Sequence, residues 1–300
     1  MPPKPAVRKA VLPVAGLGTR FLPVTKAIPK ELLPIVDVPS IQLIVEECVE
    51  SGIEEVILVT ARGKEAIENH FDSAPGLEAI LERKGKDADL NSVRRLTGLA
   101  RFASVRQGVA NGLGHAVLCA RAAVGGEPFA VILGDDLVEA KPPGIRQLLD
   151  VYQRHGVGVV GLQEVPPGQE HLYGIIEGNR VAAREWKLRR LIEKPAQGTA
   201  PSRMAVIGRY VLPPEIFDIL EKTPRGRGDE IQLTDGLATL CEARGLFGVE
   251  IDGRRFDAGD RAGYVLANLH FALRRADIGA EVRAGVERLL RELDSAPPSE

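Results

Sequence analysis

The chain has little of what marks secreted, membrane-spanning or disulfide-rich proteins. Only three cysteines occur in 300 residues, and Cys48, Cys119 and Cys241 are far apart with no CxxC pair. We therefore expect buried, reduced thiols rather than a disulfide framework or a zinc site. No apolar run is long enough to cross a bilayer, and the N-terminal segment lacks the apolar centre of a signal peptide. These absences predict a cytoplasmic protein.

The chain also lacks an excess of charge of either sign. Its 39 basic and 41 acidic residues are interspersed and leave a formal net charge of −2. This balance gives no reason to expect nucleic acid or a membrane as a partner. Any affinity for phosphate must come from a few cations and backbone amides placed locally.

What the chain does have is an alternation of apolar runs and helical patterns. Apolar runs within 10–14, 54–60, 128–133 and 157–162 indicate buried strands. Helical periodicity follows at 41–49, where Ser40 is the expected N-cap, and again at 64–71, 113–122 and 145–152. Such alternation is typical of a parallel sheet with crossover helices.

The second half of the chain is less regular. Short strand-like runs within 163–212 are expected to extend the sheet and to form a small flap, and the remainder is expected to be helical apart from one strand near 247–251. We expect an α/β fold: a Rossmann-like three-layer sandwich with a mixed, mostly parallel sheet, a small antiparallel flap and C-terminal helices. One domain is expected over 8–280, with a charged surface excursion at 74–100 and a C-terminal helix and tail at 281–300.

A glycine-rich loop follows the first predicted strand. Gly16 and Gly18 let backbone amides approach an anion, and Arg20 adds a guanidinium that binds phosphate oxygens. The dinucleotide fingerprint would need glycine where Phe21 stands, and the P-loop pattern also fails. A plain tight turn is the alternative. Lys30, held between prolines, is a second candidate phosphate ligand or else a solvated surface cation.

Two aspartates are candidate metal ligands. Asp135 comes directly after a buried strand, where α/β folds bind ligands, and Asp257 stands beside a flexible glycine. Both supply the oxygen ligands that Mg²⁺ prefers, although a helix cap or turn is the commoner role of such a residue. Asp260 is the expected cap of the helix that follows.

A Glu-Lys-Pro sequence ends another apolar strand. Strand alternation predicts that Glu193 and Lys194 point to opposite sides, so that one can meet sugar hydroxyls and the other a phosphate. An ordinary exposed strand end is the alternative.

These features occur in an order that resembles the sugar-phosphate nucleotidylyltransferase family. The resemblance covers about residues 8–280 and rests on the segments 16–23, 29–34, 106–108, 112–116, 193–195 and 257–259 together with Asp135. Within the family, the segments 26–31, 67–72, 112–119 and 228–235 are similar to the branch that uses UTP and glucose 1-phosphate.

The resemblance implies the synthesis of UDP-glucose and pyrophosphate from these substrates, with Mg²⁺, by a homodimer or homotetramer. By the same resemblance, Arg20, Lys30 and Lys194 are catalytic, and Asp135 and Asp257 hold the metal. The implied nucleotide contacts are Ala15, Gly16, Gly18, Thr19, Glu31, Gln107 and Gly112. Gln107 is expected to offer uracil both a donor and an acceptor. The implied sugar contacts are Gly174 and Glu193.

Three alternatives remain at this point. A sugar-1-phosphate thymidylyltransferase would differ in its nucleotide by one methyl group and one hydroxyl. An NAD-dependent oxidoreductase is disfavoured by Phe21 and by Thr60, which stands where an acidic residue would be needed. A non-catalytic nucleotide-binding regulator requires that the two aspartates fail to hold a metal.

Overall fold

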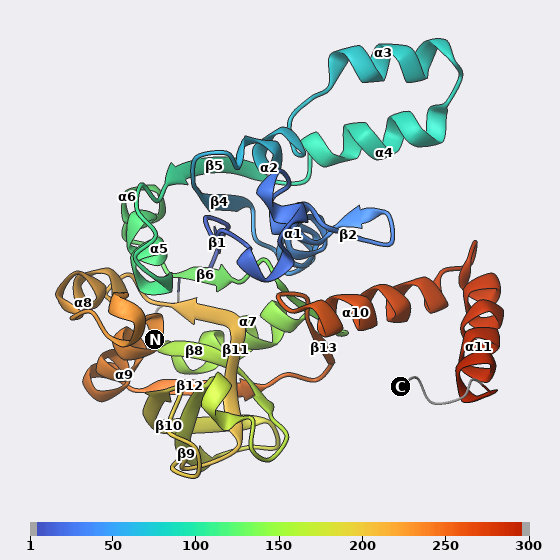
Figure 1. The fold of residues 1–300 in the computed structure, drawn as a ribbon. Helices are drawn as coiled ribbons and strands as arrows, with labels where there is room; N and C mark the ends of the chain where they lie inside the picture. The colour runs from blue at the N-terminus through green and yellow to red at the C-terminus, as the bar shows by residue number, and fades with distance from the viewer. Residues whose placement is uncertain (1–4, 296–300) are drawn as a thin grey trace.

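The computed structural model describes residues 5–295, which fold around one nine-stranded sheet (Figure 1). In spatial order its strands are β5 (Arg101–Arg106), β4 (Glu55–Thr60), β1 (Lys9–Pro13), β6 (Phe129–Ile132), β11 (Met204–Leu212), β8 (Gly158–Glu164), β12 (Leu246–Glu250), β10 (Glu185–Glu193) and β9 (Gly174–Arg180). Only β11 and β10 run against the other strands of this sheet. The hairpin of β9 and β10 lies at one edge of the sheet. It falls within residues 163–212, where the sequence predicted a small antiparallel flap.

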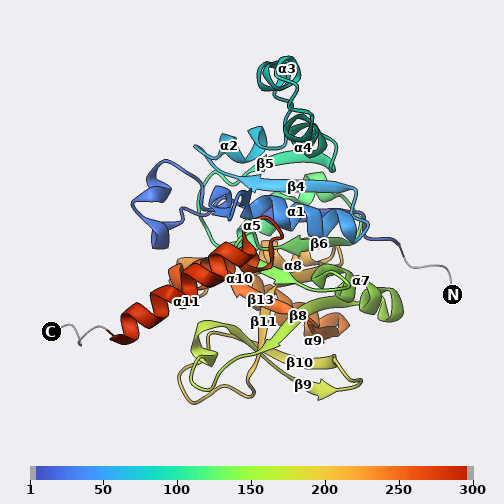
Figure 2. The ribbon, with the colours of Figure 1, turned by 90° about the vertical axis from the view of Figure 1, so that its right-hand side faces the viewer.

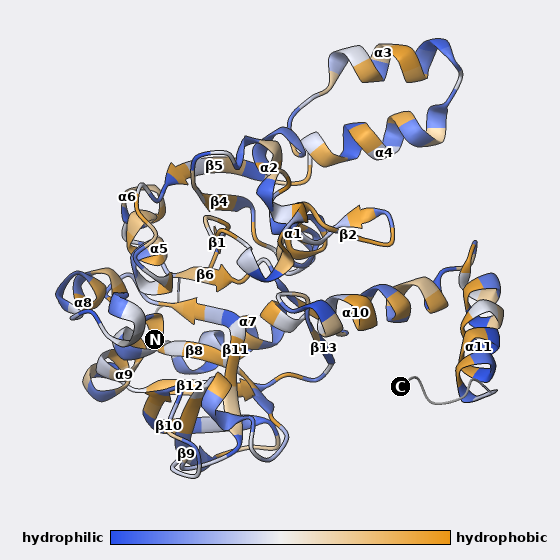
Figure 3. Cartoon of the chain, viewed as in Figure 1, coloured by the Kyte–Doolittle hydropathy of each residue, from blue (hydrophilic) through white to orange (hydrophobic). Residues whose placement is uncertain are grey.

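Helices cover both faces of the sheet, because successive side chains of each strand point to opposite sides. In β1, Ala10 and Leu12 join one apolar core and Val11 joins the other. The first core is covered by α1 (Ser40–Glu50), α2 (Glu65–Asn69), α7 (Gly144–His155) and α10 (Arg261–Arg274). The second is covered by α5 (Leu113–Cys119), α6 (Arg121–Val124), α8 (Ile216–Lys222) and α9 (Leu233–Arg244). The three-layer α/β prediction is confirmed, and Figure 3 shows the apolar strands between the helices.

Three helices project from this body. The hairpin of α3 (Pro75–Arg83) and α4 (Asp87–Thr97) extends beyond β5, and an ion pair of 3.0 Å between Arg94 Nε and Glu78 Oε2 joins its two helices. At the other end of the chain, α11 (Gly279–Ser295) follows α10 and extends away from the sheet (Figure 2). The last part of the predicted tail, 296–300, lies outside the described residues. Within residues 5–295, no helix is long and apolar enough to span a membrane.

Two short strand pairs complete the fold. β2 (Pro34–Ile35) pairs with β3 (Val38–Pro39), and β7 (Asp136–Glu139) pairs with β13 (Arg254–Asp257). The prediction of only one strand after residue 212 was wrong, because β13 is short and polar and its sequence carries no alternating pattern. Its pairing with β7 places Asp257 opposite Asp136.

Two further local predictions were wrong and one is confirmed. Ser40 is the first residue of α1 rather than its N-cap, and its Oγ donates to the backbone oxygen of Glu31 at 3.0 Å. Cys119 is only partly buried, although Cys48 and Cys241 are buried and all three thiols are free. Asp260 caps α10 as predicted, since its Oδ1 accepts from the backbone nitrogen of Gly263 at 2.9 Å.

A buried ion pair fastens α1 to the centre of the sheet. Arg209, which is 0% exposed, donates through Nη2 to Oε2 of Glu47 at 2.7 Å and through Nε to Oε1 at 3.0 Å. Glu47 Oε1 also accepts from the backbone nitrogen of Ile145 at 2.8 Å, at the start of α7. The Glu47 carboxylate therefore links three elements, α1, β11 and α7.

Replacing Glu47 with glutamine is expected to lower the free energy of unfolding by about 3 kcal/mol, because it removes the charge of the carboxylate that binds the buried Arg209 guanidinium through two hydrogen bonds. Urea unfolding followed by circular dichroism measures this change. The neighbouring Glu46→Gln is the control, because Glu46 pairs with the exposed Arg95 and should matter by less than about 1 kcal/mol. A Glu47→Gln protein as stable as this control would contradict the interpretation.

Candidate active site

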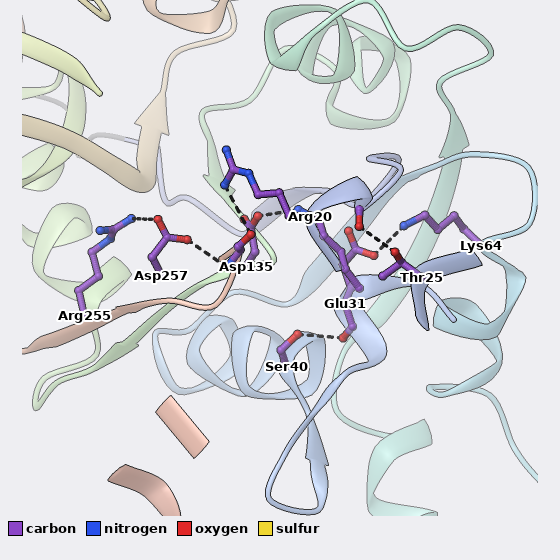
Figure 4. Close-up of polar contacts among 11 residues, drawn as sticks. Arg20, Thr25, Glu31, Ser40, Lys64, Asp135, Arg255 and Asp257 are labelled. Atoms are coloured by element: carbon purple, nitrogen blue, oxygen red, sulfur yellow. Dashed lines mark hydrogen bonds and ion pairs between the residues drawn. The ribbon is translucent and has the colours of Figure 1, made fainter. Parts of the chain in front are cut away.

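The glycine-rich loop after β1 folds back onto the segment that follows it. Gly18 has a φ of 66°, and a Cβ there would lie 3.1 Å from Cγ2 of Thr25 and 3.2 Å from Cβ of Lys30. Thr25 Oγ1 donates to the backbone oxygen of Gly18 at 2.8 Å (Figure 4). The left-handed φ and the close approach both favour glycine at this position. The fold thereby brings the loop against Lys30.

Residues of the glycine-rich loop line two cavities, and the first lies at the carboxyl ends of β1, β5 and β6, where α/β folds bind ligands. The first, of about 380 Å³, is lined among others by the predicted residues Ala15, Gly16, Gly18, Thr19, Lys30, Glu31, Gln107, Gly112 and Asp135. The second, of about 450 Å³, is lined by Arg20, His171, Leu172, Tyr173, Lys194, Asp257 and Asp260. We call them the nucleotide cavity and the sugar cavity, after the ligands that the sequence predicts for Gly16 and Gln107 in the first and for the Glu193-Lys194 segment beside the second.

Lys30 and Asp135 form a close ion pair in the nucleotide cavity, with 2.5 Å between Nζ and Oδ2. Burial by itself would lower the pKa of Lys30, but the charges of Asp135 and Glu31 and the hydrogen bond to Asp135 together outweigh burial, and the pKa is raised. Burial would likewise raise the pKa of Asp135, and Lys30 more than offsets this, so that the pKa is lowered. Both groups are therefore charged at neutral pH. The position of the Lys30 ammonium shows that a cation is favoured beside Asp135.

Asp135 and Asp257 converge on Gly259. A Cβ on Gly259 would lie 2.6 Å from Oδ2 of Asp135 and 3.0 Å from Oδ1 of Asp257, so a side chain there would fill the space between the carboxylates. The backbone nitrogen of Gly259 donates to Oδ1 of Asp257 at 3.0 Å (Figure 4). The pairing of β7 with β13 produces this convergence, because Asp135 directly precedes β7 and Asp257 ends β13.

Arg255 holds the Asp257 carboxylate, and Asp136 in turn holds Arg255; sequence reasoning missed both residues. Arg255 Nη2 lies 3.6 Å from Oδ2 of Asp257, and its Nε donates to Oδ1 of Asp136 at 2.6 Å. Burial raises the pKa of Asp257, Arg255 lowers it, and the neighbouring carboxylates raise it again. A second cation near Asp257 would favour its charged form.

The two convergent carboxylates fit Mg²⁺. No group of three or more His, Cys, Asp or Glu side chains that could hold a metal occurs within the described residues. Mg²⁺ is commonly bound by one or two carboxylates and completes its coordination with substrate phosphates and water. Asp135 and Asp257 supply that number of carboxylates beside a cavity lined by the glycine-rich loop.

Glu31 lines the nucleotide cavity but is only 1% exposed. Its Oε2 accepts from Nζ of Lys64 at 2.8 Å, whereas its Oε1 is buried with no hydrogen-bond partner among the described residues. Burial raises the pKa of Glu31, and the charge of Lys64 opposes the rise. Lys64 was missed because nothing in its local sequence distinguishes it from a solvated lysine at a turn.

Glu193 and Lys194 lie on the same side, contrary to the prediction. Lys194 has a φ of 43°, which breaks the strand alternation, and its Nζ lies 3.4 Å from Oε1 of Glu193. Glu193 Oε2 also accepts from Oγ1 of Thr234, a residue of α9 that was missed, at 2.7 Å. Gly174 pairs with Glu193 across the hairpin, and a Cβ on Gly174 would lie 3.3 Å from Oε2 of Glu193.

Gln107 lines the nucleotide cavity and Arg20 lines the sugar cavity. Gln107 Nε2 donates to the backbone oxygen of Gly112 at 3.1 Å and lies 3.0 Å from Nδ1 of His115. Both hydrogens of the amide therefore face partners within the chain, and the expected contact of Gln107 with uracil stays a prediction. Arg20 Nη1 donates to the backbone oxygen of Gly259 at 3.5 Å, which brings it near the two carboxylates.

Known proteins are similar to this chain over most of its length. A family model described as nucleotidyl transferase matches residues 9–270. The chain belongs to this family. It is 49% identical over 286 residues to the UTP–glucose-1-phosphate uridylyltransferase of Bacillus subtilis, an alignment that covers 95% of this chain and 98% of the relative. The resemblance to nucleotidyltransferases of the UTP branch is thus confirmed.

Solved nucleotidyltransferase structures are also similar. One is the UTP-bound UGPase from Acinetobacter baumannii, with a TM-score of 0.88 and 40% identity over 94% of this chain and 99% of the other. A second, a UDP-glucose pyrophosphorylase complexed with UDP-glucose, has a TM-score of 0.83 and 40% identity over 90% of this chain and 100% of the other. The shared fold is that of nucleotidyltransferases rather than of the NAD-dependent oxidoreductases that were weighed as an alternative.

Proposed function

We propose that this chain transfers the uridylyl group of UTP to α-D-glucose 1-phosphate and releases pyrophosphate. The observation that carries this proposal is the position of Asp135 and Asp257. Asp135 lines the nucleotide cavity together with the glycine-rich loop and Lys30, Asp257 lines the sugar cavity together with Arg20 and Lys194, and both carboxylates lie close to Gly259. Two phosphorylated substrates bound in these cavities would meet at the carboxylates.

The reaction needs no nucleophilic side chain. A phosphate oxygen of glucose 1-phosphate forms a bond to the α-phosphorus of UTP. The bond from that phosphorus to the oxygen bridging to the β-phosphorus breaks, and pyrophosphate leaves with the electron pair. No proton has to move, because the attacking oxygen is already anionic. Positioning and neutralisation of charge supply the rate enhancement, as in other phosphoryl-group transfers.

Each candidate residue has a part in this scheme. Lys30 and Arg20 stabilise the β- and γ-phosphates and the departing pyrophosphate, and Lys194 holds the phosphate of the sugar. The nucleotide is contacted by the glycine-rich loop, through Ala15, Gly16, Gly18 and Thr19. It is also contacted by Gly112, in the part of the nucleotide cavity that receives the base, which we call the base end. Glu193, held by Thr234, and the backbone of Gly174 bind glucose hydroxyls. We assign Glu31 to positioning Lys30 and Lys64 rather than to direct contact.

Mg²⁺ would be held by Asp135 and Asp257. When bound, it would neutralise phosphate charge and help to align the phosphates. Lys30 is paired with Asp135 in this structure. We propose that, as substrate and metal bind, the ammonium leaves that carboxylate and binds phosphate oxygens instead.

A cytoplasmic location of the protein stays a prediction.

The stereochemistry at the α-phosphorus tests this proposal. With one diastereomer of UTP that carries sulfur on the α-phosphorus, a single displacement inverts the configuration in the UDP-glucose analogue formed. Phosphorus NMR of the product distinguishes inversion from retention. Retention would indicate a covalent nucleotidyl-enzyme intermediate and would contradict direct attack by the sugar phosphate.

We further propose a homodimer or homotetramer formed through the C-terminal helices. Apolar residues occur along α11 (Figure 3), and three of them are exposed: Leu289 at 56%, Leu290 at 56% and Leu293 at 71%. Helical spacing places them near one another, and such clusters on projecting helices mark interaction surfaces.

Light scattering after size exclusion is expected to give a mass of two or four times the 32.3 kDa of the chain. The double substitution Leu290→Glu and Leu293→Glu should lower that mass. Leu77→Glu on α3, where Leu77 is also exposed, should leave it unchanged. A single-chain mass for the unmodified protein would contradict this proposal.

A further inference from the structure

The amide of Gln107 is held at the base end of the nucleotide cavity. Gln107 follows β5, its backbone nitrogen donates to the backbone oxygen of Thr60 at 2.8 Å, and its side chain lines the cavity although the residue is only 7% exposed. His115, on the first turns of α5, lies beside it and belongs to none of the residues expected to bind substrate.

Two partners fix the direction in which this amide faces. The backbone oxygen of Gly112 can only accept a hydrogen bond, so the atom 3.1 Å from it must be the amide nitrogen. The second hydrogen of that nitrogen is directed at Nδ1 of His115, 3.0 Å away, which must therefore be the acceptor. Nδ1 of His115 then carries no hydrogen, and Oε1 of Gln107 is the amide atom left for a ligand.

We infer that His115 is a positioning residue for nucleotide selection, an inference that rests on the proposed use of a uridine nucleotide. Uracil carries a hydrogen on N3, which can be donated to Oε1 of Gln107. Cytosine carries a lone pair on N3, which would face the same oxygen and repel it. A fixed acceptor therefore favours uracil, and a buried mismatch of this kind costs more than the good pair contributes.

Without His115, the orientation of the amide would rest on one hydrogen bond. A flipped Gln107 would place its nitrogen toward the base, where it could donate to N3 of cytosine. The flip would direct Oε1 at the backbone oxygen of Gly112, and this repulsion limits the flipped fraction without abolishing it. Loss of the His115 acceptor should therefore weaken discrimination against cytosine more than it weakens catalysis.

Substitutions at His115 test this inference. His115→Leu removes the acceptor at similar volume, and His115→Ala provides a second variant should the leucine disturb the fold. His115→Asn is the matched control, because Oδ1 of asparagine can stand where Nδ1 of histidine stands. Affinities for UTP and CTP are measured by calorimetry without sugar phosphate, and kcat and KM are measured with UTP.

For the leucine and alanine variants we expect the affinity ratio of UTP to CTP to fall about tenfold, the scale of one hydrogen bond. KM for UTP should rise, and kcat at saturating UTP should stay within about twofold of the unmodified enzyme. His115→Asn should keep the original ratio. An unchanged ratio in both the leucine and alanine variants would overturn the inference.

Failure of the proposed function is a separate result. It would appear in the unmodified enzyme as no turnover with UTP and glucose 1-phosphate. If the unmodified enzyme preferred dTTP, the proposed nucleotide would be wrong. The same variants could then be compared with dTTP against CTP, because thymine also carries a hydrogen on N3.

Discussion

Replacing Asp135 with asparagine is expected to lower kcat/KM for pyrophosphate release at least about 100-fold, the scale of losing one preorganised charge contact. Asp135 supplies one of two carboxylates that converge on Gly259, and it is the partner of Lys30 at 2.5 Å. The substitution keeps the shape of the side chain and removes its charge. It therefore weakens the proposed metal site and leaves Lys30 without its counter-charge.

Initial rates at several Mg²⁺ concentrations test this prediction. The Mg²⁺ concentration needed for half-maximal rate should rise in Asp135→Asn, which a general loss of folded protein would not cause. Asp150→Asn is the control, because Asp150 lies on α7 and pairs with Arg146 at the surface. Near-normal turnover in Asp135→Asn would show that the metal-ligand role is misassigned.

Replacing Lys194 with alanine is expected to lower turnover by a similar factor of at least about 100. Its ammonium lies 3.4 Å from Oε1 of Glu193 and lines the cavity that also contains Arg20 and Asp257. A cation at this place is suited to hold the phosphate of the sugar substrate close to the α-phosphorus. Loss of the Lys194 ammonium removes positive charge from the place where the two negatively charged substrates must approach each other.

Separate titration of each substrate distinguishes this role. KM for glucose 1-phosphate should rise in Lys194→Ala, whereas KM for UTP should change little. Lys187→Ala is the control, because Lys187 is exposed on the same strand, β10, away from the site. If the variant turned over normally, or if only KM for UTP changed, Lys194 would not be the residue that holds the sugar phosphate.

The sequence sufficed for the layers of the fold and for the approximate position of the site. The strands β1, β4 and β6 are short apolar runs, and such runs alternating with helical periodicity are enough to predict a sheet with helices on both faces. Because parallel strands end at one edge, the loop after β1 and Asp135 after β6 could be placed together from their order alone.

The features that the sequence did not predict depend on contacts between segments that are distant in the chain. β13 is a strand only because β7 pairs with it, and that pairing brings Asp257 to Asp135. The left-handed φ of Lys194 occurs where a strand ends, and alternation no longer applies there. The partners of Gln107 and Glu31 are His115 on α5 and Lys64 after β4, and neither carries a local signal of its role.

The rate of pyrophosphate release with each nucleoside triphosphate tests the central claim most directly. The protein is mixed with Mg²⁺ and glucose 1-phosphate, and UTP, dTTP, CTP, ATP and GTP are supplied in turn. The account predicts the fastest release with UTP and none when glucose 1-phosphate is omitted. No release with any nucleotide would contradict the proposed activity, and faster release with dTTP than with UTP would contradict the assigned nucleotide.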